Sequence, residues 1–486
     1  MVTKAVRIAG GRRRAAANQS GEGRAPTQAE GVHPRPAAAA IHPIGFAFKA
    51  ERHNGPARRT KVSNDTGRAE SAARERVVIV GSGQAAVELA ASLRQRNFVG
   101  SVILVGNESD LPYHRPVLSK EFHPASKTVT PLRAQSFYDA NSIELRLGTF
   151  AERIERRARV LVLADGTSLT YDHLVLATGA RNRLPAVRGF DVNRALELRT
   201  LDHARKFAAR AAEFRHVTIV GGGFIGLEVA CLLRGCDIEV DLIEAGDRLL
   251  GRALSPVMSD YFRLFHTRAG VRLRFGNTVR SIGRDSTREV VTLTDGTMIY
   301  TDAIMTAIGV LPNDALAAAA GLKIDNGVVV DQQLRTSDPS ISAIGDCAAF
   351  PNPFGSGLVR LESVQNAIDQ ARCVAARLTG SPVPYRSLPW FWSNQGSARL
   401  QIAGLAADID GAVLRGERDD DAFSVFLYRG EQLIAVESVN KPSDHMVARR
   451  ILSAGISLPK SMAADADADL KELANAAMVC GGVPAA

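Results

Sequence analysis

Residues 77–93 read VVIVGSGQAAVELAASL, and this stretch decides the fold. The run of apolar, mostly β-branched residues predicts a buried strand, and the residues after the glycines have the spacing of an amphipathic helix. A second strand, SVILVG, is predicted from Ser101. The order of strand, glycine turn, helix and strand predicts a β–α–β unit of an α/β protein.

The glycine turn of this unit has the spacing found in dinucleotide-binding proteins. Gly81, Gly83 and Ala86 occupy the G-x-G-x-x-G/A positions. The first glycine allows the tight turn, the second lets the backbone approach a pyrophosphate, and the small third residue lets helix and strand pack closely. The helix N-terminus then faces the phosphates. An acid after the next strand is expected to bind the ribose, and Glu108 takes that position, 27 residues after Gly81.

The same pattern returns at residues 217–233, VTIVGGGFIGLEVACLL. The three motif positions are Gly221, Gly223 and Gly226. The next predicted strand ends at Glu244, whose carboxylate accepts from a ribose 2′-hydroxyl and repels a 2′-phosphate, which favours NAD over NADP. Arg248, four residues further on, is a cation that weakens this preference. The sequence therefore predicts two nucleotide sites in one chain.

The positive charge of the chain is concentrated in its first residues. Residues 1–70 hold 13 Lys and Arg and 5 Asp and Glu, a net of +8, whereas the whole chain has a net charge of +9. Since the body is nearly neutral, the composition does not indicate a nucleic-acid partner. Residues 1–74 have no strand or helix period and are predicted to be a disordered basic extension, with an organellar transit peptide as the alternative.

The cysteines and the hydropathy bear on location. Five scattered cysteines without the spacing of a structural disulfide framework or of a metal site favour a reducing, cytoplasmic compartment. The longest apolar stretch, residues 304–322, is interrupted by Pro312, Asn313 and Asp314, so no membrane span is predicted.

Several further stretches complete a pattern that resembles one enzyme family. They are LPYHRPVLSKEF (111–122), VGGGFIGLEVA (220–230), TSDPSISAIGDCA (336–348), RLESVQNAIDQA (360–371) and PWFWSNQ (389–395). Together they resemble the FAD-dependent NADH:ferredoxin reductases of oxygenase systems, the family of the putidaredoxin, rhodocoxin and aromatic-dioxygenase reductases.

This resemblance implies an α/β fold with two Rossmann-like dinucleotide-binding domains, for FAD and NAD, of the glutathione-reductase type, followed by a C-terminal α+β domain. The implied segments after the extension are 75–186 (FAD, first part), 187–312 (NAD), 313–386 (FAD, second part) and 387–486 (C-terminal reductase domain).

The resemblance also implies roles for single residues. Lys120 is expected to pair with Glu228 beside the flavin, where hydride arrival builds negative charge, and Trp392 to lie over the flavin. These three are the candidate catalytic residues, and all three are also expected to contact a cofactor. Asp346 is expected to bind the ribityl chain of FAD, and Glu362 to begin a helix whose N-terminus points at the flavin. The other implied cofactor contacts are Arg115, Ala177, Thr178, Gly179, Arg181, Gly309, Gly345 and Val364.

Some of these assignments have plainer alternatives. Glu362 is equally a helix-start acid, and a pair of core aromatics is the alternative for Trp390 with Trp392. Cys231 and Cys236 have the C-x4-C spacing of a redox disulfide but fall in the second unit, whereas a redox pair belongs near Arg115 in the first. They are therefore predicted to be core thiols.

The predicted function is transfer of hydride from NADH to FAD, followed by single electrons to a 2Fe–2S ferredoxin that serves a cytochrome P450 or a Rieske-type oxygenase. The predicted assembly is a monomer or a homodimer. An NADH oxidase or a rubredoxin reductase on the same fold is one alternative, since a fold does not decide the acceptor. An NADH-sensing flavoprotein of the apoptosis-inducing-factor type is another.

Overall fold

The computed structural model describes residues 75–120 and 129–480. The basic extension expected at residues 1–74 and the end of the motif at 111–122 lie outside the described residues. Among the helices that the structure describes, none is long and apolar enough to cross a membrane.

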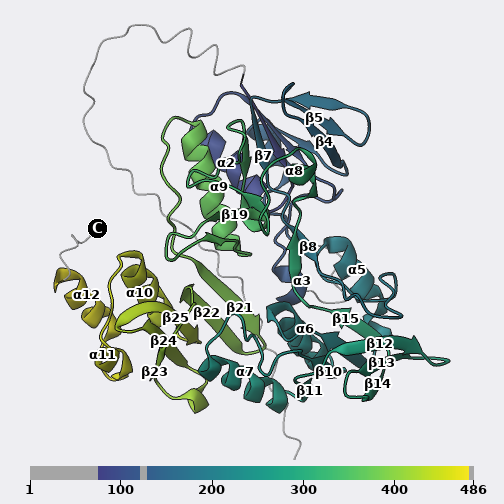
Figure 1. Ribbon diagram of the computed structural model, residues 1–486, viewed down its shortest axis with the longest axis vertical. Helices are drawn as coiled ribbons and strands as arrows, with labels where there is room; N and C mark the ends of the chain where they lie inside the picture. The colour runs from purple at the N-terminus through teal and green to yellow at the C-terminus, as the bar shows by residue number, and fades with distance from the viewer. Residues whose placement is uncertain (1–74, 121–128, 481–486) are drawn as a thin grey trace, which may run out of the picture. The chain divides into compact units, whose positions relative to one another are not determined.

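A five-stranded parallel sheet contains the first glycine unit, in the strand order β18-β7-β1-β2-β3. Figure 1 labels β7 of this sheet. Its strands are β1 (Arg76–Val80), β2 (Ser101–Val105), β3 (Ile143–Arg146), β7 (His173–Leu176) and β18 (Ile341–Ala343). The strands predicted at residues 77–80 and from Ser101 are confirmed. Since β18 comes from a distant part of the chain, residues on both sides of the second unit build this one sheet.

Two helices, α2 (Gln84–Gln95) and α9 (Val364–Leu378), lie side by side beside this sheet (Figure 1). Leu89 and Leu93 of α2 share a buried core with Ala371 and Val374 of α9. The spacing of three or four residues puts these side chains on one helix face. The smaller elements here are α3 (Val117–Lys120), α4 (Gln135–Ala140), β4 (Ala151–Glu155), β5 (Val160–Leu163), β6 (Ser168–Thr170), α8 (Ala315–Ala319), β17 (Val328–Val329), η2 (Gly345–Cys347), β19 (Ala348–Pro351) and β20 (Leu358–Val359).

A four-stranded parallel sheet contains the second glycine unit, in the order β11-β10-β9-β15. Its strands are β9 (His216–Val220), β10 (Glu239–Ile243), β11 (Val271–Arg274) and β15 (Ala303–Thr306). An antiparallel sheet of β12 (Val279–Arg284), β13 (Glu289–Leu293) and β14 (Met298–Thr301) follows β11 in the chain. The helices of this part are α5 (Leu201–Arg210), η1 (Ala211–Glu213), α6 (Phe224–Gly235) and α7 (Pro256–Arg268).

The chain enters and leaves the second sheet at one place. Strand β8 (Ala180–Asn182) precedes the sheet, β16 (Val310–Pro312) follows it, and the two pair antiparallel, with Leu311 opposite Arg181. This pairing brings the two ends of the inserted segment together.

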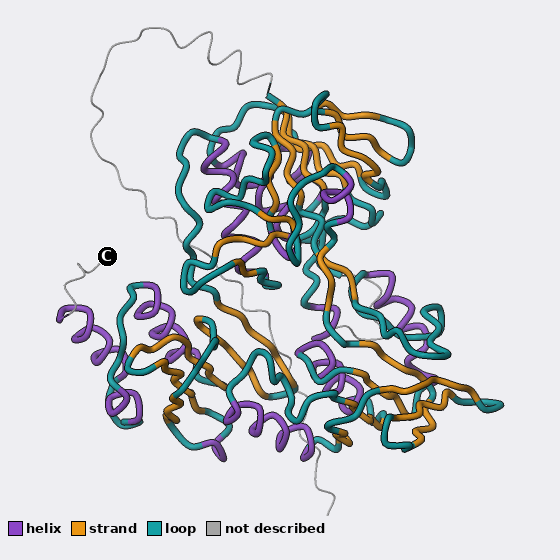
Figure 2. The backbone as a smooth tube through the Cα atoms, in the orientation of Figure 1, coloured by secondary structure: helices purple, strands orange, loops and turns teal. Residues whose placement is uncertain are grey.

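The C-terminal part is an antiparallel sheet with helices beside it, as Figure 2 shows by its strand and helix colours. Its strand order is β21-β22-β25-β24-β23. Its elements are β21 (Trp390–Gln395), β22 (Ala398–Gly404), β23 (Gly411–Arg415), η3 (Arg418–Asp420), β24 (Phe423–Arg429), β25 (Gln432–Val439), α10 (Pro442–Ser453), α11 (Lys460–Ala464) and α12 (Leu470–Cys480). The α/β class with a C-terminal α+β domain is therefore confirmed.

The two faces of the C-terminal sheet have different neighbours because side chains alternate along a strand. On β24, Phe423 and Val425 join a buried cluster with Phe262 of α7, from the second unit. Phe426, the residue after Val425, points to the other face and joins a cluster with Ile451 of α10. One continuous apolar core thus joins the C-terminal sheet to the second dinucleotide unit.

Candidate functional site

The first glycine turn has the geometry that a bound dinucleotide needs. Gly81 has φ +124°, and a Cβ at this position would lie 2.1 Å from the Ala177 carbonyl oxygen, so only glycine fits. A Cβ at Gly83 would have no atom within 4 Å, which leaves this backbone open to a ligand. Ala86 is fully buried, as a small third residue should be.

The second turn repeats this arrangement. Gly221 has φ +112°, and its Cβ would lie 2.3 Å from the Ala307 carbonyl oxygen. A Cβ at Gly226 would lie 2.2 Å from the Gly221 carbonyl oxygen, whereas the nearest atom to a Cβ at Gly223 would be the Ala307 carbonyl oxygen, 4.0 Å away. Only glycine therefore fits at the first and third positions of this turn.

The helices that follow the two turns begin without a side-chain cap. Gly83 and Gly223 are the N-cap residues of α2 and α6, and neither helix has a capping side-chain hydrogen bond in the described structure. By contrast, the side chains of Thr200, Ser255 and Ser363 cap α5, α7 and α9. Free N–H groups at a helix N-terminus are a binding site for phosphate. The two turns thus fit the pyrophosphates of two dinucleotides.

The two ribose candidates differ in their contacts. Glu244 accepts hydrogen bonds from the backbone N–H of Gly222 and of Gly246, both at 2.8 Å. Glu108 instead pairs with Arg115 Nη2 at 2.5 Å and accepts from Tyr113 Oη at 2.7 Å. Arg115, a predicted cofactor residue, therefore lies against Glu108, and its Nη1 also donates to the Arg199 carbonyl oxygen.

The predicted pair of Lys120 and Glu228 is present. Lys120 Nζ is 2.7 Å from Glu228 Oε1, with only 1% of the Glu228 side chain exposed. Ser119 Oγ donates to Glu228 Oε2 at 2.5 Å, and Ser393 Oγ donates to Oε1 at 2.6 Å. The carboxylate thus accepts from α3 and from β21 while it is held on α6, so three parts of the chain meet at this one group.

The loops at the carboxyl ends of β7 and β18 place another group of predicted residues. Ala177, Thr178 and Gly179 follow β7, and Gly345 and Asp346 follow β18, which is the adjacent strand. Gly345 has φ +74°, and its N–H donates to Gln370 Oε1. Asp346 Oδ2 accepts from Arg199 Nη2 at 2.9 Å.

Two further predicted residues lie near the pairing of β8 and β16. Arg181 Nη1 donates to the Pro312 carbonyl oxygen at 2.8 Å. Gly309, with φ +95°, follows β15 just as Gly179 follows β7.

The helix expected to begin at Glu362 begins later. Its first residue is Val364, because Ser363 is the N-cap and accepts from the Asn366 N–H. Glu362 lies before the cap and pairs with Arg360 Nη1 at 2.7 Å. Burial raises the pKa of Glu362, and the nearby charge of Arg360 opposes this shift.

The tryptophans lie on β21 and are both partly exposed. Their ring centroids are 5.6 Å apart, and the Arg449 guanidinium lies 4.4 Å from the Trp390 centroid. Neither ring is buried, which argues against the core alternative.

The prediction of two core thiols is wrong for Cys236. Cys231 lies within α6 and is half-buried, but Cys236 is the C-cap residue of that helix and is exposed. The helix ends at Gly235 and its last buried residue is Leu233, so Cys236 lies beyond the packed part of the helix.

Among the residues that contact the predicted ones, Arg199, Ser119 and Ser393 were given no role by sequence reasoning. Arg199 lies outside every quoted motif, and no spacing pointed to it. Ser119 and Ser393 lay inside the stretches 111–122 and 389–395, but a serine carries no signal of its own without its partner in space.

The fold and the two glycine turns define a dinucleotide-binding oxidoreductase. The family model described as "Pyridine nucleotide-disulphide oxidoreductase" matches residues 75–371, and the one described as "Reductase C-terminal" matches residues 390–474. The chain belongs to the pyridine nucleotide-disulphide oxidoreductase family, a membership that implies FAD and NAD(P) as cofactors.

Three known proteins identify the branch of this family. The chain is 49% identical over 398 residues to rhodocoxin reductase from Rhodococcus erythropolis, covering 81% of this chain and 93% of that protein. The crystal structure of the ferredoxin reductase for the CYP199A2 system from Rhodopseudomonas palustris has a TM-score of 0.80 and 44% identity, covering 82% of this chain and 100% of that one. The covalent putidaredoxin reductase–putidaredoxin complex has a TM-score of 0.79 and 36% identity, covering 83% and 99%. The predicted resemblance to ferredoxin reductases of oxygenase systems is confirmed.

Proposed function

We propose that this chain is an FAD-dependent NADH:ferredoxin reductase that serves a cytochrome P450 or a Rieske-type oxygenase. The observation that carries the proposal is the 49% identity to rhodocoxin reductase across nearly the full length of that protein, together with two uncapped helix N-termini behind glycine turns. When bound, FAD supplies the conversion of a two-electron hydride into single electrons. The protein binds, orients and shields the reactants.

The residues around the first turn are the proposed FAD site. The N–H groups at the start of α2, beyond Gly83, would hold the pyrophosphate, and Glu108 with Arg115 would lie near the adenosine end. Asp346, Gly345 and the loop 177–179 would hold the ribityl chain and the ring edge, with Arg181, Glu362 and Val364 around them. Arg199 supports this assignment, because it holds Asp346 in place through an ion pair.

The residues around the second turn are the proposed nicotinamide-dinucleotide site, with preference for NADH. Glu244 is fixed by two backbone N–H groups and would accept the ribose hydroxyls. In this proposal Arg248 would not weaken the preference, because its guanidinium donates to the carbonyl oxygens of Gly251 and Leu254 and to Ser259 Oγ. Those donors would then not be offered to a 2′-phosphate.

Lys120, Glu228 and Trp392 are the proposed catalytic residues. A lysine held 2.7 Å from a nearly buried carboxylate is a fixed cation, which would stabilise negative charge that develops beside it. Trp392, partly exposed on β21, would cover the flavin and limit the access of water.

The proposed acceptor is a small 2Fe–2S ferredoxin, supported by the likeness to the putidaredoxin reductase–putidaredoxin complex. We also propose the domain segments 75–186 with 313–386 for FAD, 187–312 for NAD and 387–486 for the reductase domain. The pairing of β8 with β16 at the ends of the middle segment supports these limits. A cytoplasmic location and a monomeric or dimeric state remain part of the proposal.

The test is an anaerobic titration of the purified flavoprotein with NADH and, separately, with NADPH, followed by a 2Fe–2S ferredoxin from the same genome. The expected result is bleaching of the flavin by NADH, much slower bleaching by NADPH, and rapid reduction of the ferredoxin cluster. Bleaching that only oxygen reverses would reject the ferredoxin assignment and favour an NADH oxidase.

A further inference from the structure

A ring of buried polar groups starts and ends on helix α6. Ser393 Oγ is 2.6 Å from Glu228 Oε1, and Gln395 Nε2 is 3.3 Å from Ser393 Oγ. Gln395 Oε1 is 2.8 Å from His266 Nε2, and His266 Nδ1 is 3.8 Å from Cys231 Sγ. Cys231 and Glu228 are three residues apart on α6 and so lie on one helix face. The ring therefore runs from α6 to β21, then to α7, and returns to α6.

The charge on Glu228 fixes the direction of every hydrogen bond in this ring. A carboxylate only accepts, so the Ser393 hydroxyl donates its one proton to Glu228. The Ser393 oxygen then accepts from the Gln395 amide N–H, which turns the amide oxygen toward His266. Because that oxygen only accepts, His266 carries its proton on Nε2 and accepts at Nδ1 from the Cys231 thiol.

The burial of the ring agrees with this direction. Ser393, Gln395 and His266 are all fully buried. Burial lowers the pKa of His266 to about 4, so its imidazole is neutral at pH 7 and has a single N–H. Burial, followed by the charge of Glu228, raises the pKa of Cys231 to about 12, which keeps its sulfur protonated as a donor.

We propose that Ser393 is a positioning residue, oriented by Gln395 and His266, which holds the Glu228 carboxylate directed at Lys120. The inference rests on the proposed function, in which Lys120 acts beside the flavin. The C-terminal domain would then contribute to the flavin site not only Trp392 but also the Ser393 hydroxyl, which orients Glu228.

The geometry explains why one hydroxyl suffices. Glu228 Oε1 accepts from both Ser393 and Lys120, while Oε2 accepts from Ser119. Without Ser393 the carboxylate keeps donors on the α3 side only and loses a hydrogen bond that favours its charged form. Lys120 would then lose its fixed position. The titratable groups around Glu228 in the described residues are Lys120 on α3, Cys231 on α6 and, through the ring, His266 on α7.

The chain offers a matched control for Ser393. Ser424 of β24 lies in the same sheet, is fully buried, and also donates to a carboxylate, Asp444 Oδ2, at 2.9 Å. Asp444 lies on α10, and among the described residues its side chain contacts Ser424, Ser443 and Arg415, not Lys120 or Glu228. Ser393→Ala and Ser424→Ala thus remove the same group from similar surroundings, and only the first touches Glu228.

The first experiment measures NADH-driven bleaching of the flavin by anaerobic stopped flow between pH 5.5 and 9, with thermal unfolding measured in parallel. Ser393→Ala is expected to slow bleaching about tenfold at pH 7 and to move the acid limb of the pH profile up by about one unit. Ser393→Thr, which keeps the hydroxyl, should restore both. Ser424→Ala should leave the rate and the profile unchanged, whatever its effect on the unfolding temperature.

Lys120→Met separates failure of this inference from failure of the proposed function. If Lys120→Met slows bleaching and Ser393→Ala behaves like Ser424→Ala, Ser393 is only structural and the inference is overturned. If Lys120→Met leaves bleaching unchanged, the role proposed for the Lys120–Glu228 pair fails, and the inference fails with it.

The second experiment does not depend on turnover. In protein with ¹⁵N-labelled histidine, the His266 signal, assigned by its loss in His266→Gln, is expected to show the neutral Nε2–H tautomer alone from pH 6 to 8. In Ser393→Ala the amide is no longer oriented, and a mixture of tautomers is expected. A mixture already in the unmodified protein would show that the ring has no fixed direction and would overturn the proposal.

Discussion

The two dinucleotide units, β1-α2-β2 and β9-α6-β10, share a backbone but differ in the side chains around it. Both turns begin with a glycine of positive φ that lies under a carbonyl oxygen of the neighbouring strand's loop. In both sheets, an aspartate carboxylate also accepts from the backbone N–H of the first residue of a central strand. The Asp172 carboxylate accepts from the Arg76 N–H, and the Asp302 carboxylate accepts from the His216 N–H. Backbone geometry has been kept in both units.

The side chains within the two sheets differ most at one position. In the first unit, Ile103 of β2 lies opposite Val78 of β1 and is buried. In the second unit, Asp241 of β10 lies opposite Thr218 of β9 and is 2% exposed. A carboxylate therefore occupies the place of an isoleucine.

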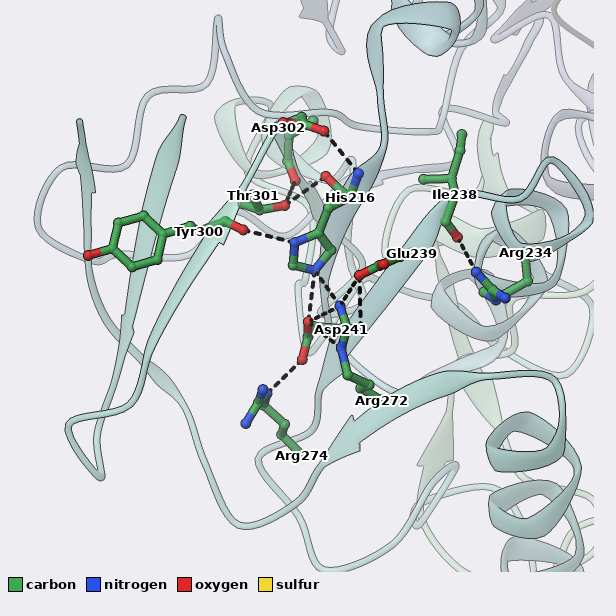
Figure 3. Close-up of polar contacts among 11 residues, drawn as sticks. His216, Arg234, Ile238, Glu239, Asp241, Arg272, Arg274, Tyr300, Thr301 and Asp302 are labelled. Carbon is green, nitrogen blue, oxygen red and sulfur yellow. Dashed lines mark hydrogen bonds and ion pairs between the residues drawn. The ribbon is translucent and has the colours of Figure 1, made fainter. Parts of the chain in front are cut away.

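Asp241 is surrounded by donors, as Figure 3 shows. Its carboxylate is 2.8 Å from His216 Nε2, 2.8 Å from Arg274 Nε and 3.0 Å from Arg272. Burial alone would raise the pKa of Asp241, but the hydrogen bonds from His216, Arg274 and Arg272 outweigh it and lower the pKa to about 2. A repeated backbone thus constrains the glycines of the turns strictly and leaves the side chains of the strands free to change.

The largest expected effect comes from the first glycine of each turn. Ala in place of Gly81 or Gly221 would place a Cβ within 2.3 Å of a backbone oxygen at positive φ. We expect Gly81→Ala to be purified largely without flavin. Gly221→Ala should keep its flavin but bind NADH about 100-fold more weakly, or about 3 kcal/mol. The measurements are the flavin-to-protein absorbance ratio and the NADH titration.

These variants can break the comparison. If Gly221→Ala also lost its flavin, the two units would not be separate sites. Gly283→Ala is the control, since its Cβ would have no atom within 4 Å and lies on β12 away from both turns.

The second prediction concerns Asp241. Asp241→Asn removes the charge that pairs with His216, Arg272 and Arg274, so we expect a loss of about 2 kcal/mol in unfolding free energy. The conservative Ile103→Val in the first unit should cost about 1 kcal/mol. Thermal and denaturant unfolding, followed by NADH-site and flavin signals separately, measure both.

The pH dependence of this loss has a defined sign. The pKa of Asp241 is lowered from 3.8 to about 2 in the folded chain. The charge of Asp241 therefore gives its full stabilisation of the fold when the pH is above the ordinary pKa of 3.8. The difference in stability between the unmodified protein and Asp241→Asn should narrow as the pH falls below about 4, and disappear near pH 2. A difference that grew in acid would contradict the pairing.

The features that could be predicted from the sequence are those of the backbone turns, and the features that could not are contacts between distant side chains. The glycine turns and the strands around them could be predicted, because each needs a residue type that local spacing reveals, whereas the insertion of one unit in the other was implied only by the family resemblance. The partners of Glu228 in the C-terminal sheet could not, since Ser393 is 165 positions away and nothing local distinguishes it from other serines. Asp241 was also missed, because one acid in an apolar strand gives no sign of the arginines that join it from the neighbouring strand.

The third prediction concerns Glu244 and Glu108, the two acidic residues proposed to bind a ribose. Glu244→Ala should lower the preference for NADH over NADPH about tenfold, near 1.4 kcal/mol, by removing the acceptor and the repulsion of a phosphate. Glu108→Ala should leave that preference unchanged and loosen flavin binding, because Glu108 holds Arg115 rather than lying at the nucleotide site of the second unit. The ratio of kcat/KM for the two nucleotides tests this. An altered ratio in Glu108→Ala would contradict the division of roles.

The smallest expected effect comes from the third position of the turns, where the first unit has Ala86 and the second has Gly226. Ala86→Gly makes the first turn like the second, and the added backbone freedom in α2 should cost only about 0.5–1 kcal/mol. The reverse exchange, Gly226→Ala, should cost more because the new Cβ would lie 2.2 Å from the Gly221 carbonyl oxygen. Denaturant unfolding of the two variants measures this asymmetry. Equal losses of unfolding free energy in the two variants would contradict this prediction. They would mean that α6 can move away from its strand to make room for a Cβ, so that the third position differs between the units in sequence but not in the space available.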